Sequence, residues 1–284
     1  MPLKLMYITN KPEIALIAEQ NGVDRIFVDM EYIGKAERQG DLDTVKNHHK
    51  IEDIAVLRSV LTQSELLVRV NPIHEACSEY TSSEEEIEAA IAAGADIIML
   101  PFFKTVSEVD RFLSSVNGRV KTMLLLETPE AVEVLDEILD RPGIDEVHIG
   151  INDLSIGYKK SFMFELLTDG TVERLCRKMQ QRKVFYGFGG IASLGRGRVP
   201  AELIIKEHYW LGSRMAILSR SFCNVDRYDD LSAIEEIFFR GVREIRMLEK
   251  ECAAHIHYFC ENRKELGSAV RVAVEEIKAE NAQK

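Results

Sequence analysis

The chain has 284 residues, of which 46% are hydrophobic and 29% are charged, and its formal net charge is −11 at pH 7. A chain of this length and composition can bury a large core without disulfides, so we expect one folded domain over residues 1–284. The acidic balance disfavours nucleic acid as a partner. No apolar run reaches the roughly 18 residues that a membrane span requires, so we expect no membrane partner.

The five cysteines indicate a reducing compartment. They are odd in number, widely spaced and without a CxxC pair, which is typical of free thiols: Cys77, Cys176, Cys223, Cys252 and Cys260. Acidic residues also interrupt the apolar runs near the start of the chain, so no signal peptide is predicted. We therefore expect a cytoplasmic protein.

Short apolar runs alternate with helix-like segments along the sequence. The predicted strands are 3–8, 25–29, 66–70, 96–100, 120–126, 146–149, 184–187 and 210–217. Most lack strict polar and apolar alternation, which is typical of parallel strands covered by helices. Eight such units predict an α/β fold of the closed (β/α)8 TIM-barrel type, whereas an open doubly wound sheet usually has fewer strands and a clear topological switch.

Residues 231–284 extend beyond what an eighth barrel helix requires. Helices are predicted over about 231–262 and 266–279, with an apolar stripe that includes Ile234, Ile237, Phe238 and Val242. We expect these extra C-terminal helices to contact a second copy of the chain, and hence a homo-oligomer.

Catalytic groups of β/α barrels lie at the carboxyl ends of the strands. Asp29 and Glu31 follow the second predicted strand, Pro101 follows the fourth, and Asn152 and Asp153 follow the sixth. These positions are the first candidates for a site.

Glu127 and Asp153 follow the fifth and sixth strands, so two carboxylates are predicted over one end of the barrel. Hard oxygen ligands with room for water and substrate suit Mg²⁺ or Mn²⁺. The absence of a nearby cluster of His and Cys residues argues against zinc. A structural alternative explains both residues equally well from spacing alone: Glu127 would cap the helix that begins at Pro129, and Asp153 would close a turn.

Arg69 stands in an apolar run at the end of the third strand. A buried cation at a barrel mouth is costly unless an anion meets it, and the planar guanidinium matches a carboxylate in a bidentate way. Arg69 is therefore a candidate catalytic and substrate-binding residue. An ion pair with Glu31 or Glu127 is the alternative, and it is compatible with substrate binding.

The segment 187–198 is rich in glycine and arginine for a strand-seven loop. Gly189 and Gly190 would let backbone N–H groups approach a substrate, and Arg196 and Arg198 would recognise a phosphate or a second carboxylate. A flexible turn with solvated arginines is the alternative. Further cations in loop or strand-eight positions are Lys35, Arg38, Arg214 and Arg220.

Five motifs occur in order along roughly residues 3–220. They are Val-Asp-Met-Glu after strand two, Val-Arg-Val-Asn-Pro after strand three, Gly-Ala-Asp-Ile-Ile-Met-Leu-Pro through strand four, Leu-Glu-Thr-Pro-Glu-Ala-Val after strand five, and Pro-Gly-Ile-Asp-Glu-Val-His-Ile-Gly-Ile-Asn-Asp-Leu-Ser through strand six. Together they resemble the HpcH/HpaI aldolase and citrate lyase β-chain superfamily. The resemblance implies that Glu127 and Asp153 bind the metal and that Arg69 contacts a 2-oxo acid or its enolate. Pro101, which ends the third motif, is a further expected substrate contact.

One position departs from the aldolase branch of that family, which has a proton-transferring histidine directly after the Glu of the first motif. Here that position is Tyr32, and a neutral tyrosine is a poor base because its ordinary pKa is about 10. His48 or His49, in the polar segment after the second strand, would take over the role, or they are solvated loop residues. Tyr32, His48 and His49 are therefore candidate catalytic residues.

The resemblance implies a divalent-metal-dependent carbon–carbon lyase of the class II aldolase type, with pyruvate or a related 2-oxo acid and an aldehyde as its small-molecule partners. Two alternatives stay open: a citrate lyase-type enzyme that cleaves acyl thioesters, and a catalytically silent barrel that binds a metabolite.

Overall fold

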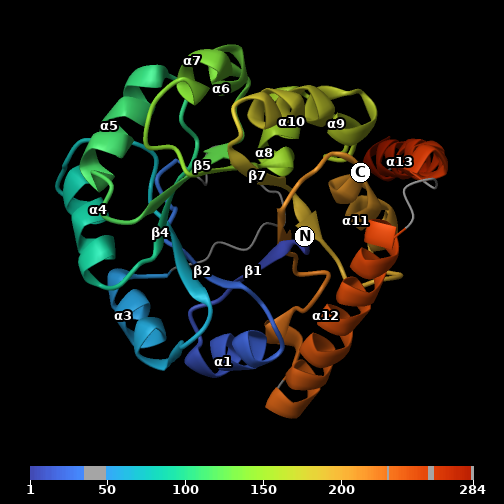
Figure 1. Cartoon of the computed structure of the whole chain (residues 1–284), viewed down its shortest axis with the longest axis horizontal. Helices are drawn as coiled ribbons and strands as arrows, with labels where there is room; N and C mark the ends of the chain where they lie inside the picture. Colours follow the sequence, from blue (N-terminus) through green and yellow to red (C-terminus); the bar gives the residue numbers. More distant parts are fainter. Residues whose placement is uncertain (35–48, 229, 255–258, 283–284) are drawn as a thin grey trace.

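The computed structural model describes residues 1–34, 49–228, 230–254 and 259–282, and Figure 1 shows a central sheet enclosed by helices. Within these residues nine parallel strand segments are hydrogen-bonded in the order β7-β6-β5-β4-β3-β2-β1-β9-β8. They are β1 Lys4–Ile8, β2 Arg25–Asp29, β3 Glu65–Arg69, β4 Ile97–Leu100, β5 Lys121–Leu126, β6 Glu146–Ile149, β7 Phe185–Phe188, β8 Gly190–Ile191 and β9 Met215–Leu218.

Strands β7 and β8 are two halves of one interrupted strand that closes the barrel. β7 pairs with β6 and β8 pairs with β9, while Gly189 lies between them with φ +53°. The Gly189 N–H donates to the carbonyl of Ile149 at 3.0 Å, and its carbonyl accepts from the Ile217 N–H at 3.3 Å. A Cβ at this position would lie 2.6 Å from Ile151 Cδ1, so only glycine fits. The barrel thus has eight strand positions, which confirms the predicted (β/α)8 fold.

The observed strands match the predicted ranges within one or two residues, apart from the last. Residue Trp210, placed in a strand by the sequence, is the final residue of helix α11 Ala201–Trp210, and β9 begins only at Met215. A short apolar run does not distinguish a buried helix end from a strand, and here the turn at Gly212, with φ +67°, separates the two elements.

Helices follow the strands around the barrel. They are α1 Pro12–Gln20, α3 Ile51–Val60, α4 Ser83–Ala92, α5 Val106–Val116, α6 Pro129–Glu133, α7 Leu135–Leu139, α8 Ile151–Gly157, α9 Glu165–Thr168, α10 Thr171–Gln181, α11, the 3₁₀ turn η1 Val225–Arg227, α12 Leu231–Ala254 and α13 Phe259–Ala282. Ser82, Thr105 and Thr128 cap α4, α5 and α6 by accepting backbone N–H groups, because an N-cap oxygen satisfies donors that the first turn leaves unpaired. No helix in this part of the chain is long and apolar enough to cross a bilayer.

The inside of the barrel is layered along its axis. At the end where the strands begin, the buried Arg25 guanidinium binds Glu146 in a bidentate way, at 2.6 and 2.7 Å, and Glu65 at 2.8 Å. A middle layer is apolar and includes Phe27, Leu67 and Met123. The charged layer thus lies at the amino ends, opposite the carboxyl ends at which β/α barrels carry their functional sites.

The two C-terminal helices have different roles. Helix α12 packs against α11 and α1 and so occupies the place of the eighth barrel helix, while α13 packs on α11 and α9 outside that ring (Figure 1). The stripe of Ile234, Phe238 and Val242 is buried within the chain, and Phe238 contacts the Tyr7 ring edge-on at 4.9 Å. The apolar stripe from which we predicted self-association therefore packs within a single chain. A homo-oligomer stays a prediction.

Candidate active site

At the carboxyl ends of the strands, the Arg69 guanidinium is held by two carboxylates. Its Nε and Nη2 each lie 2.8 Å from an Asp29 carboxylate oxygen, and its Nη1 lies 3.2 Å from Glu31 Oε2. The Arg69 side chain is 13% exposed and the two carboxylates are buried. Burial by itself lowers the pKa of Arg69, but the charges of Asp29 and Glu31 outweigh it and raise the pKa above its ordinary value. The group is therefore a permanently charged, fixed fork.

The structure shows ion pairs of Arg69 with two carboxylates, and substrate binding by Arg69 stays a prediction. The ion pair with Glu31 forms as the alternative proposed, but the main partner is Asp29, its neighbour in the register of β2 and β3. Asp29 and Glu31 were both candidates for catalysis, and the structure engages both with Arg69. Asp29 binds the guanidinium through two hydrogen bonds and Glu31 through one ion pair, so both carboxylates orient Arg69.

Glu127 is buried directly after β5, and the backbone of two neighbouring loops fixes its side chain. Its Oε1 accepts a hydrogen bond from the Phe102 N–H at 3.0 Å, and Phe102 adopts φ +48°, a conformation that non-glycine residues rarely adopt. On its other side Glu127 contacts Gly150, where a Cβ would lie 2.8 Å from both Glu127 Cβ and Oε2. The side chain of Glu127 is thus confined from two sides.

The surroundings of Glu127 disfavour its negative charge. Burial, together with the charges of Glu31 and Asp153, raises the pKa of Glu127 well above its ordinary value, and Arg69 offsets only part of this effect. Glu127 and Asp153 line one cavity of about 450 Å³, which we call the carboxylate cavity. A cation in that cavity would favour the ionised carboxylates.

The donor set of the carboxylate cavity suits a hard divalent cation. Glu127 and Asp153 supply carboxylate oxygens, the ligands preferred by Mg²⁺ and Mn²⁺, and the cavity leaves space for further oxygen ligands. In the described ranges no group of three or more His, Cys, Asp or Glu side chains is arranged to hold a metal. A metal bound in this cavity would take Glu127 and Asp153 as ligands, together with water or substrate.

Tyr32 occupies the position of the family histidine and lies largely at the surface. The residue is 50% exposed, and its ring contacts the Tyr80 ring edge-on at 6.3 Å. Its backbone N–H donates to Asn71 Oδ1 at 2.9 Å. Partial burial and the charge of Glu86 raise the pKa of Tyr32. A raised pKa leaves even less phenolate at neutral pH, so Tyr32 is poorly suited to be the base.

Of the two candidate histidines, His48 lies outside the described residues and His49 lies beside Asp29. The Asp29 backbone N–H donates to His49 Nδ1 at 2.9 Å. In neutral imidazole this interaction assigns the proton to Nε2, which makes Nε2 a donor. His49 is therefore placed to donate a hydrogen bond rather than to accept a proton at Nε2.

A second cavity, of about 420 Å³, opens beside Arg69, Asp29 and His49, and we call it the mouth cavity. The structure adds residues to it that sequence reasoning missed, at the ends of strands one and eight: Tyr7, Thr9, Asn10, Ser219 and Asn224. Functional residues of β/α barrels are also expected at the ends of β1 and β9. Because the sequence placed the last strand too early, the residues after β9 were not recognised as strand-end residues.

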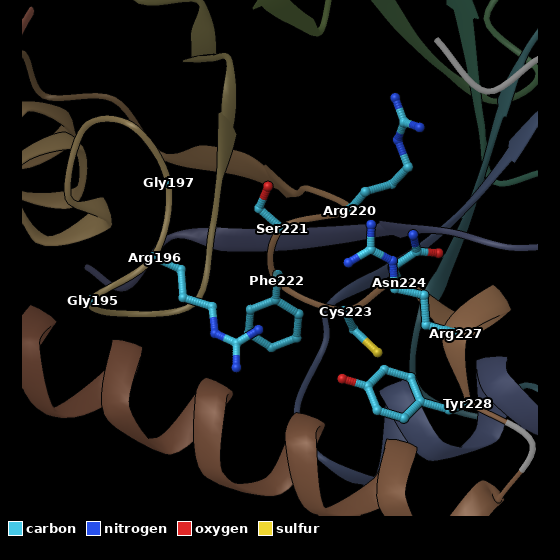
Figure 2. Close-up of a pocket in the computed structure, with 10 residues that line it drawn as sticks. All are labelled: Gly195, Arg196, Gly197, Arg220, Ser221, Phe222, Cys223, Asn224, Arg227 and Tyr228. Atoms are coloured by element: carbon cyan, nitrogen blue, oxygen red, sulfur yellow. The ribbon is translucent and has the colours of Figure 1, made fainter. Parts of the chain in front are cut away.

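The remaining candidates from the sequence lie in different parts of the structure. Pro101 is buried after β4, and the backbone of Gly189 is used to close the barrel. Arg198 forms a bidentate ion pair with Glu280 of α13, at 3.0 and 2.8 Å, so the structure engages it away from the mouth cavity. Arg196 instead lines a third cavity, of about 570 Å³, together with Arg220 and Arg227 (Figure 2).

Solved structures of other proteins resemble this chain in fold. The solved structures include an HpcH/HpaI aldolase/citrate lyase family protein from Burkholderia cenocepacia J2315, with TM-score 0.56, 15% identity, and coverage of 83% of this chain and 95% of that one. An HpcH/HpaI aldolase from Desulfitobacterium hafniense DCB-2 gives TM-score 0.58, 17% identity, and coverage of 86% and 93%. The citrate synthase SbnG gives TM-score 0.57, 17% identity, and coverage of 82% and 91%.

These identities establish a shared fold only. No curated protein matches the sequence. The family model described as HpcH/HpaI aldolase/citrate lyase matches residues 4–169, which is more than half of the 284 residues and spans every strand end that carries Asp29, Arg69, Glu127 and Asp153. The chain therefore belongs to the HpcH/HpaI aldolase/citrate lyase family.

Proposed function

We propose that the chain is a divalent-metal-dependent carbon–carbon lyase that acts through the enolate of pyruvate or a related 2-oxo acid. The observation that carries this proposal is that Arg69, Glu127 and Asp153 lie at or just after the carboxyl ends of β3, β5 and β6, with Glu127 buried. Family membership supports an enzyme of the lyase and aldolase type. The metal and the substrate are our inference.

In this proposal Glu127 and Asp153 would hold Mg²⁺ or Mn²⁺, which would supply Lewis-acid polarisation of the substrate carbonyl and carboxylate. Arg69 supplies a second positive charge where negative charge develops on the enolate oxygen. Because Asp29 and Glu31 already fix the guanidinium, little reorganisation accompanies the reaction. The buried position of the fork strengthens this interaction relative to one in water.

The retro-aldol step breaks the bond between C3 and C4 of the 2-oxo acid. The C4 hydroxyl loses its proton to a base as the aldehyde forms, the bonding electron pair passes into the enolate, and C3 later gains a proton to give pyruvate. The contacts that the structure shows for Tyr32 and His49 are with the Tyr80 ring and with the Asp29 N–H. We therefore propose that water in the mouth cavity carries the proton from the C4 hydroxyl to C3, with His49 Nε2 as a hydrogen-bond donor to that water.

The test compares metal affinity and enolisation in matched variants. Glu127→Gln and Asp153→Asn each remove a ligand charge with little change in volume, so Mn²⁺ affinity measured by calorimetry should fall at least tenfold, and exchange of pyruvate methyl protons in deuterated buffer should be lost. The matched control is Glu130→Gln, because Glu130 lines the same cavity but pairs with Lys104 on the surface.

Unchanged Mn²⁺ affinity in both ligand variants would refute the metal site. Metal binding without proton exchange on any variant would instead favour an acyl-thioester lyase or a silent barrel. The control should match the parent chain in both measurements.

A further inference from the structure

The third cavity, which we call the distal cavity, lies where the loop after β8 meets the segment after β9 (Figure 2). Three arginines line it: Arg196 from the first loop, Arg220 from the end of β9, and Arg227 from η1. Figure 2 shows the side chains of all three arginines around this cavity. Three separate segments thus bring positive charge to one cavity of about 570 Å³.

Arg196 and Arg227 differ from Arg198 in their ion pairing. Among the described residues neither guanidinium has an ion-pair partner, whereas Arg198, two residues after Arg196 in the same loop, pairs with Glu276 and Glu280. The chain is acidic, with net charge −11, and many of its other arginines form ion pairs. These two arginines line one cavity without such a partner among the described residues. They are suited to recognise an anion.

The arginine side chains, rather than the glycine-rich backbone, provide the donors. The Gly195 N–H already donates to Glu202 Oε1 at 2.8 Å, and the Arg196 N–H donates to the Ser193 carbonyl at 3.0 Å. Positive φ at Gly195 and Gly197, +72° and +94°, shapes the turn that carries Arg196 between them. The acidic group nearest in sequence on the η1 side, Asp226, faces Lys11 at 3.5 Å.

The distal cavity adjoins the mouth cavity. Both are lined by Arg220, Cys223 and Asn224, and the mouth cavity is lined in turn by Arg69. A linear substrate with its reacting end at Arg69 therefore has a continuous path to Arg196 and Arg227. A 2-oxo acid as small as pyruvate would leave this path empty.

We propose that the distal cavity binds a phosphate group at the far end of the substrate, with Arg196 and Arg227 as its ligands. A phosphate monoester carries close to two negative charges at neutral pH and presents three oxygens, which matches several guanidinium forks, whereas a carboxylate is satisfied by one. This assignment deepens the proposed lyase function by naming the substrate class, a phosphorylated 2-oxo acid, and it rests on that function.

The first experiment measures inorganic phosphate binding to the metal-free chain by calorimetry, so its result does not depend on lyase activity. Arg196→Gln and Arg227→Gln should each weaken phosphate binding about tenfold or more, because each removes a charge-assisted donor pair. Arg198→Gln is the matched control, since it removes the same charge from the same loop but from a guanidinium held by Glu280. No phosphate binding, or equal weakening by all three substitutions, would overturn the site.

The second experiment distinguishes a substrate phosphate from free phosphate. The probes are the pyruvate aldol adducts of glyceraldehyde and of glyceraldehyde 3-phosphate, which differ only by the phosphate, and their affinities are measured on the metal-free chain. The phosphorylated adduct should bind at least tenfold more tightly, and this ratio should approach one in Arg196→Gln and Arg227→Gln but persist in Arg198→Gln. Phosphate binding with equal affinity for both adducts would mean that the cavity serves free phosphate, and the substrate assignment would be wrong.

Discussion

Gly150 shows how a residue without chemistry of its own determines the site. It precedes α8, whose first turn carries Asp153, and its missing side chain leaves the space that Glu127 occupies. Atoms at 2.8 Å from a Cβ are closer than van der Waals contact allows, so any larger residue must displace the carboxylate.

We expect Gly150→Ala to weaken Mn²⁺ binding at least tenfold while the chain stays folded, because the added methyl group moves Glu127 away from the Phe102 N–H and from Asp153. Calorimetry with Mn²⁺ and circular dichroism measure the two effects. Gly267→Ala is the control, since a Cβ there meets only Arg271 Nη1, at 3.7 Å in α13. Wild-type Mn²⁺ affinity in Gly150→Ala would contradict our placement of the ligands.

The candidate site was predictable where it depends on local sequence, and not where it depends on distant partners. Arg69 and Glu127 could be identified because each follows an apolar run, and the carboxyl ends of parallel strands converge. The pairing of Arg198 with Glu280 spans 82 residues, so sequence alone favoured Arg198 as much as Arg196. Arg227 lies in a short 3₁₀ turn that no periodicity predicts.

At the scale of elements, helix α13 covers an unusual carboxylate on α11. Glu207 is fully buried, and its nearest cation is Arg263 of α13, 3.5 Å away, which also pairs with Glu173 at 2.9 Å. Burial raises the pKa of Glu207 to about 7, although Arg263 acts in the opposite direction. The contact between α11 and α13 therefore contains a group that titrates near neutrality.

Glu207 should make stability decrease as pH rises. Its ordinary pKa is 4.5, so between that value and about pH 7 the folded chain holds more protons than the unfolded chain, and the free energy of unfolding falls by up to roughly 3 kcal/mol. Glu207→Gln should raise the melting temperature at pH 8 by several degrees and change it little at pH 5. Melting curves at both pH values test this expectation, with the exposed Glu235→Gln as control, and equal shifts at both would refute it.

At the scale of the whole molecule, two buried histidines link the barrel wall to its outer helices. His148 on β6 and His208 on α11 are both buried, and His208 stacks on Phe188 at 3.8 Å. Burial lowers the pKa of His148 to about 4 and that of His208 to about 3. Both imidazoles are therefore neutral in the folded chain at neutral pH.

These histidines should destabilise the fold in acid. Below their ordinary pKa of 6.5 the unfolded chain binds protons that the folded chain does not, so the free energy of unfolding falls as pH drops from about 6.5 towards 4. Because neither His148 ring nitrogen has a hydrogen-bond partner among the described residues, His148→Leu should flatten this decline without a large loss at pH 7.5. Urea unfolding at pH 5 and 7.5 measures the difference, and an unchanged decline in the variant would refute the assignment. His74→Gln, a change at a half-buried histidine in the loop before α4, should leave the decline as in the parent chain.

The interrupted closing strand divides the rim of the barrel into two sectors. The loops that carry Arg196, Arg220 and Arg227 follow β8 and β9, which pair on one side of Gly189, whereas β6, which leads to Asp153, pairs with β7 and β5 on the other side. In the proposed lyase, insertions or substitutions in the first sector would change which distal group is accepted without shifting the carboxylates of the second. Such a division would let the substrate range diverge in evolution while the proposed bond-breaking chemistry is retained.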